Sequence, residues 1–203
     1  MYDESSIVKL LGKKLDTWTL PAKNWARSEG EPVICPKCWK LKLGVYPTPV
    51  DVRLRHLETG TSYDFVFRGG VAVVHEQLLE WLRPYMRGFV LGRCLWEDGS
   101  PIPGYHSIYM RDALRTRAGQ DAEYHVCEVC GQAGGSWGAT PYALRVEIPV
   151  GDVFQDQIRV LWLSSSLARQ FPWRRFSDQK PFSIPVRDEP LADDPLPARP
   201  VRD

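Results

Sequence analysis

The chain has 203 residues, of which 43% are hydrophobic and 25% are charged, a composition typical of a folded protein and not of a disordered one. Its formal net charge of +1 excludes a strong overall field that would draw it to nucleic acid or to an anionic membrane. No apolar stretch reaches the roughly 18 to 20 residues that span a bilayer, and the acidic start MYDESS lacks the features of a secretory signal. We therefore expect a cytoplasmic protein with no membrane partner.

The first half of the sequence predicts strands around one helix. Residues 5–15 are weakly periodic and favour a short helix. Apolar and charged residues alternate over 50–55, which predicts a strand, and two more strands are expected on either side of the glycines at 69–70. The segment 75–86 has leucines at helical spacing and leads into an apolar strand over 88–96.

The last third of the sequence repeats this block. Residues 158–163 predict a strand, residues 164–171 a short helix capped by a serine, and residues 180–186 a closing strand. The alignment places Val74 on Leu163, His75 on Ser164, Leu78 on Leu167 and Leu82 on Phe171. An internal duplication and a chance match between short amphipathic elements both explain it. In either case the fold class is α+β, with mixed sheets and short helices.

The chain is expected to divide into a folded part and a tail. Residues 1–187 should form one α+β domain, either single or bilobed. Residues 188–203 contain four prolines and few large apolar side chains. Burial cannot offset the entropy lost on ordering such a segment, so we expect a mobile tail.

Two C-x-x-C pairs carry the most specific chemical signal, Cys35 with Cys38 and Cys127 with Cys130. Two intervening residues let both sulfurs of a pair face one point, and structural zinc takes four such ligands at the corners of a tetrahedron. Paired cysteines in a reducing cytoplasm are more often metal ligands or catalytic groups than disulfides. We predict one structural zinc per chain in a split, zinc-ribbon-like site of four cysteines, formed by residues 35–38 and 127–130 around an inserted region, 45–125.

Other interpretations of these cysteines stay open. A redox-active pair would need to lie at a helix N-terminus, where the thiolate is stabilised, and four inert buried thiols are the third alternative. Cys94 stands apart in an apolar run and is expected to be a small buried side chain. His125, two residues before Cys127, could replace a thiolate, but four cysteines already fill the tetrahedron.

Signs of catalysis are missing from the sequence. It has no GxxxxGK[ST], no GxGxxG after a strand, no HExxH and no GxSxG, and a four-thiolate site lacks the open position that metal catalysis needs. We therefore expect that the protein is not an enzyme. Basic residues lie beside aromatic ones at 37–42 and 172–176, as in single-strand binders, which leaves a zinc-ribbon nucleic-acid-binding or regulatory protein as the alternative function. The balanced overall charge argues against nucleic acid as a partner.

Several short segments together resemble a known family. WTLP lies ahead of the first cysteine pair, and CEVCG is followed by DVF, SSSLARQF and FSIPV. Over roughly residues 17–187 this layout is similar to the myxobacterial double-CXXCG motif family, which includes immunity proteins paired with swarming-inhibition toxins. The resemblance implies an immunity protein whose partner is a cognate protein toxin. The first pair departs from the family pattern, because Trp39 stands where glycine is expected.

Overall fold

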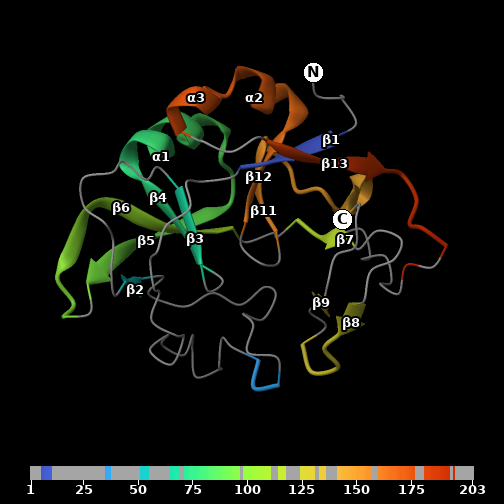
Figure 1. Cartoon of the computed structure of the whole chain (residues 1–203), viewed down its shortest axis with the longest axis horizontal. Coiled ribbons are helices and arrows are strands. Elements are labelled where there is room, and N and C mark those ends of the chain that lie inside the picture. The colour runs from blue at the N-terminus through green and yellow to red at the C-terminus, as the bar shows by residue number, and fades with distance from the viewer. Residues whose placement is uncertain are drawn as a thin grey trace.

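A computed structural model of the chain describes residues 6–10, 35–37, 51–54, 65–68, 71–96, 98–110, 114–117, 124–130, 133–135, 141–156, 160–176, 181–192 and 194. Within these residues the protein consists of two mixed β-sheets, a separate hairpin and short helices (Figure 1). The predicted α+β class is confirmed. No helix in these ranges has the length and apolar character needed to cross a bilayer.

The first half of the chain forms a five-stranded sheet in the order β2-β5-β6-β4-β3. Its strands are β2 (Val52–Leu54), β3 (Phe65–Arg68), β4 (Val71–His75), β5 (Phe89–Trp96) and β6 (Pro101–Met110). β2 runs parallel to β5, and the other pairs are antiparallel. The sequence predicted four of these strands, but it did not predict β6, the central one.

The second large sheet has six strands in the order β11-β12-β1-β13-β10-β7. These are β1 (Ser6–Lys9), β7 (Thr116–Arg117), β10 (Tyr142–Leu144), β11 (Val153–Gln155), β12 (Leu161–Ser164) and β13 (Phe182–Arg187). β10 runs parallel to β13, and the other pairs are antiparallel. Strands β8 (Tyr124–Val126) and β9 (Ala133–Gly135) form the separate hairpin.

Two short helices each begin directly after a strand. Helix α1 (Glu76–Leu82) follows β4, and His75 Nδ1 accepts the backbone N–H of Gln77 at 3.4 Å. Helix α2 (Ser165–Gln170) follows β12, and Ser164 Oγ accepts the backbone N–H of Leu167 at 3.2 Å. Each cap satisfies an N–H that has no partner within the first helical turn, and the serine cap was predicted from the sequence. The remaining helical turns are η2 (Arg83–Tyr85), η3 (Arg145–Glu147) and α3 (Trp173–Phe176).

One apolar core joins the two large sheets. It contains Val8 and Leu10 from the N-terminal strand region, Val74 and Ile108 from the five-stranded sheet, and Leu163 from β12. The buried side chains of α1 and α2 complete it, and all three α-helices lie together at the top of Figure 1. Trp81 of α1 meets Phe171 edge to face, with ring centroids 4.9 Å apart. The helices therefore connect the two halves of the molecule.

The helix predicted over residues 5–15 is wrong in its described part, because Ser6–Lys9 form strand β1. Val8 pairs with Leu163 on one side and with Ser183 on the other, so β1 lies in the middle of its sheet. Its β-branched residues fit a pleated and doubly buried position. Hydrogen bonds to strands far along the chain thus decide this segment against its weak local preference for helix.

A buried ion-pair network holds the segment after β13. The Arg117 side chain is fully buried, and its Nε and Nη2 donate to both carboxylate oxygens of Glu147 at 2.9 and 2.7 Å. Its Nη1 donates to Asp194 at 2.8 Å, and the Tyr142 hydroxyl donates to the same carboxylate. Burial alone would lower the pKa of Arg117, but the two carboxylates raise it. The segment predicted as a mobile tail is therefore held at Asp194, whose side chain is buried.

Candidate metal centre

Three of the four predicted metal ligands lie together. Cys35 belongs to the described segment 35–37, while Cys127 and Cys130 lie in the turn between β8 and β9. Their Sγ atoms all lie within 4.8 Å of one another, although Cys35 and Cys127 are 92 residues apart in sequence. The fourth predicted ligand, Cys38, lies outside the described residues. Among the residues that are described, this is the one cluster of three or more Cys, His, Asp or Glu side chains that could hold a metal ion.

The spacing of the sulfurs fits a metal site and not a disulfide. The Sγ atoms of Cys35 and Cys127 are 3.7 Å apart, and the two residues do not form a disulfide. A disulfide would require about 2.05 Å. A tetrahedral zinc site with metal–sulfur bonds of about 2.3 Å has neighbouring sulfurs roughly 3.8 Å apart. These thiols are thus already at a distance suited to sharing one metal ion.

The turn after β8 favours the thiolate form of Cys127. Backbone N–H groups of Cys130 and Val129 donate to its sulfur and lower the pKa of the thiol, against the opposite effect of burial. These donors are available because the C-x-x-C spacing folds the chain back over the first sulfur. Since the thiolate is the form that binds a metal, the same turn that brings the sulfurs together also stabilises the required charge state.

The two cysteine segments also meet through an ion pair. Lys37 pairs with Glu128, and both side chains are mostly exposed, at 53% and 75%. An exposed pair of this kind contributes about 1 kcal/mol at most. Cys35 and Cys127 are buried, whereas Cys130 is half-buried. Contact between the segments is therefore expected to depend on the sulfurs and on what they bind.

The structure also bears on the redox interpretation and on Cys94, and it describes the backbone of His125. The second C-x-x-C lies between two strands and not at a helix N-terminus, so it lacks the setting that the redox interpretation requires. Cys94 is 1% exposed in β5 and burial raises the pKa of its thiol, which confirms it as a small core residue. His125 lies in β8, and its side chain is outside the described part.

The aromatic residues at 172–176 pack on the shared core. Phe176 is 1% exposed and belongs to the shared core, and Trp173 packs against the same core. The guanidinium of Arg175 lies over the Phe176 ring at 4.8 Å and donates to Gln77 at 3.3 Å. The cluster thus joins α3 to the core and to α1, while the side chains of residues 38–42 lie outside the described residues.

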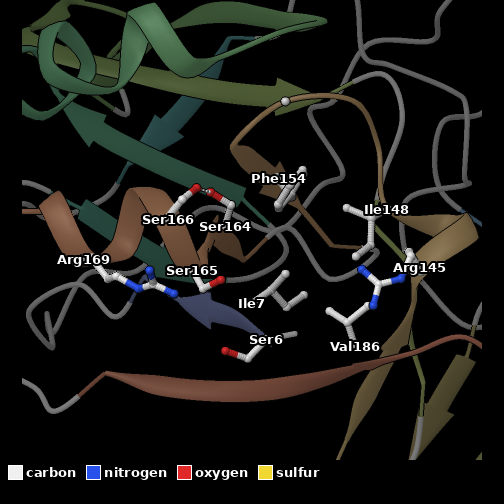
Figure 2. A pocket seen from close by; sticks show the side chains of 11 residues that line it. Ser6, Ile7, Arg145, Ile148, Phe154, Ser164, Ser165, Ser166, Arg169 and Val186 are labelled. Atoms are coloured by element: carbon white, nitrogen blue, oxygen red, sulfur yellow. Dashed lines mark hydrogen bonds between the residues drawn. The ribbon is translucent and has the colours of Figure 1, made fainter. Parts of the chain in front are cut away.

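A cavity of about 430 Å³ lies away from the cysteines, among β1, β13, η3 and α2. Figure 2 shows Arg145 and Arg169 on opposite sides of it, with Ile7 and Phe154 between them. Arg145 Nε donates to Asp188 at 2.7 Å, and both of these side chains are largely exposed. This cavity was not predicted from the sequence, because its lining comes from four separate segments that no local motif connects.

No protein-family model matches the chain, and no curated protein matches it significantly.

Proposed function

We propose that the protein is a non-enzymatic immunity protein, which binds a cognate bacterial toxin and neutralises it in the cytoplasm of the cell that makes both. The observation that carries the proposal is the meeting of cysteines from the two C-x-x-C pairs, since the resemblance to the double-CXXCG family rests on that motif. An inhibitor gains affinity when its surface is rigid before binding. A metal centre joining distant segments of the chain would supply that rigidity.

Zinc is the metal that best suits the proposed site, with Cys35, Cys38, Cys127 and Cys130 as its ligands. Thiolates select soft or borderline ions, and zinc commonly takes four of them in tetrahedral structural sites. Four protein ligands leave no open position for water or substrate. The ion would therefore stabilise the scaffold, and neutralisation would depend on the protein surface around it.

The cavity of Figure 2 is proposed as a contact site for the toxin. Its volume falls within the range of about 300 to 1,000 Å³ that is usual for binding sites. Its apolar floor suits an aliphatic side chain. The arginines at its sides suit an adjacent carboxylate, for which Arg145 would exchange its exposed bond to Asp188. Val146 and Val150, in and after η3, are 62% and 78% exposed, and they lie near lining residues Arg145, Ile148 and Gly151 in the sequence. The fitting segment of the toxin would thus pair an apolar residue with an acidic one.

Replacing both cavity arginines by glutamine, Arg145→Gln with Arg169→Gln, is expected to weaken toxin binding at least tenfold. Arginine side chains often carry a large share of interface energy, and the loss of two contacts to a carboxylate removes about 1.4 kcal/mol or more. Binding would be measured by calorimetry with a candidate toxin identified among the neighbouring genes, together with growth rescue of cells that produce that toxin. A matched control replaces the exposed Arg83 and Arg174, which lie outside the cavity.

Failure of the wild-type protein to bind or rescue would contradict the immunity function. Unchanged affinity in the cavity variant would contradict the contact site alone. Strong retention of the protein on heparin at moderate salt would instead favour the nucleic-acid-binding alternative, because a basic groove binds polyanions.

A further inference from the structure

The two large sheets have the same strand order and the same strand directions. The first runs β3-β4-β6-β5-β2, and the second runs β11-β12-β1-β13-β10 with β7 added at its end. In both sheets the first three of these pairs are antiparallel and the fourth is parallel. Agreement in order and in direction is expected when one structural unit occurs twice.

The pairing register of the two sheets agrees as well. One row across the first sheet is Phe65–Val74–His106–Arg93, and the matching row across the second is Val153–Leu163–Val8–Ser183. Residues at the same place in the two rows can be compared by their positions in the sequence. The residue of β11 lies 88 positions after that of β3, the residue of β12 lies 89 after that of β4, and the residue of β13 lies 90 after that of β5. Matching strands therefore follow one another at nearly the same intervals in both halves.

Helices α1 and α2 correspond to each other at the same sequence interval as the strands. The caps His75 and Ser164 are 89 residues apart, as the sequence alignment placed them. Leu78 and Leu167 occupy the same position in their helices, and both are buried in the shared core. Glu80 and Arg169 also correspond, and both are exposed. The buried pattern is thus kept in both halves, while the outer charge has changed sign.

We infer that the chain contains two copies of one unit and that the metal centre is the joint between them. Each copy would begin with a C-x-x-C pair, and Cys35 and Cys127 are separated by 92 residues, close to the interval between matching strands. The long spacing between the pairs is then the length of one copy and not an inserted domain. Each copy supplies two ligands, so neither copy holds a complete site.

Strand β1 is the displaced last strand of the second copy. In the first copy β6 follows β5 through a short turn, in which Gly99 has a φ of +89° and Ser100 N–H donates to Asp98 at 2.8 Å. In the second copy the same central place is filled by Ser6–Lys9, which come from the opposite end of the sequence. The N-terminal segment thus completes the second copy.

The two copies are joined in two distant places. The shared apolar core lies under the helices, at the top of Figure 1, while residues 35–37 and the β8–β9 hairpin lie at the bottom. Metal binding at the bottom would hold together ends of the copies that the core does not reach. This inference rests on the proposed metal centre but is independent of the immunity function.

A permuted chain tests the inference directly. It consists of residues 11–188, then Gly-Ser, then residues 6–10, a flexible linker of about 15 residues, and residues 189–203. The segment Arg187-Asp188-Gly-Ser has the length of the turn between β5 and β6, and its last three residues repeat Asp98-Gly99-Ser100. The linker spans the roughly 20 Å back along β13.

A second permuted chain begins at residue 11 and carries residues 1–10 after residue 203, on a flexible linker of about 20 residues. It lacks the tight turn.

Both permuted chains are expected to bind one zinc. The tight-turn chain should unfold in urea within about 0.5 M of an unpermuted chain that lacks residues 1–5, and the long-linker chain within about 0.5 M of the full chain. If the tight-turn chain is unfolded while the long-linker chain folds, β1 is separable but is not the counterpart of β6, and the inference fails. It fails also if neither chain folds. Loss of toxin binding with retained folding and zinc would affect the immunity proposal alone.

Discussion

A Cys127→Ser variant is expected to lose its metal and to unfold with a free energy lower by about 4 kcal/mol or more, a loss typical of removing a structural metal. Cys127 is buried, and its sulfur lies between Cys35 and two backbone N–H donors. Serine offers a weaker ligand and leaves the other thiols without a common partner. Zinc would be measured by elemental mass spectrometry, and stability by urea unfolding of metal-loaded protein.

The matched control for this variant is Cys94→Ala. Cys94 is also buried, but it lies in β5 among core residues and away from the other cysteines. Removing one buried sulfur atom should cost about 1 kcal/mol and leave the zinc content unchanged. A Cys127→Ser protein that keeps both its zinc and its wild-type urea midpoint would refute the structural role of the site.

A Val8→Asp variant is expected to be unfolded or destabilised by about 4 kcal/mol or more. Val8 is fully buried and pairs with strands on both sides, so no solvent can reach a carboxylate placed there. The change also affects the shared core, because Val8 packs with residues of α1 and α2. Urea unfolding followed by tryptophan fluorescence would measure the loss.

The matched control on the same strand is Lys9→Gln. Lys9 is half-buried, and its side chain points to the opposite face from that of Val8 because successive strand residues alternate. This variant should differ from wild type by less than about 1 kcal/mol. If Val8→Asp were as stable as Lys9→Gln, β1 would not be the central strand of its sheet.

The sequence could predict those elements whose signals are local. His75 and Ser164 precede leucine patterns of helical period, and both helices begin there, with the predicted serine cap at Ser164. The alternation over residues 50–55 and the apolar run over 88–96 correspond to β2 and β5. In each case the residues that define the element lie within a few positions of one another, so neighbouring side chains carry the information.

The sequence could not predict features that depend on distant partners. Strand β1 has a weak local preference, and it becomes a strand because β12 and β13 pair with it on both sides. Strand β6 contains Pro101, Pro103 and Gly104, which disfavour a strand locally. It is nevertheless held between β4 and β5. The Arg117–Asp194 pair likewise joins residues 77 positions apart, which no local pattern links.

The candidate metal site was predicted more fully than the fold around it. The C-x-x-C spacing identifies its own ligands, and three of the four, Cys35, Cys127 and Cys130, lie within reach of one ion. The sequence interpreted residues 45–125 as an inserted region, and the equal strand orders of the two sheets could not be predicted from it, because they depend on pairings between distant segments. The cavity beside α2 was not foreseen, since its two arginines come from different segments.

Metal content is the most direct test of the metal centre. The protein would be purified without a histidine tag or added zinc, and zinc per chain would be measured by elemental mass spectrometry together with the number of reactive thiols under native conditions. One zinc per chain, with Cys35, Cys38, Cys127 and Cys130 protected from alkylation, is the expected result. A metal-free protein in which these four thiols react readily would contradict the account.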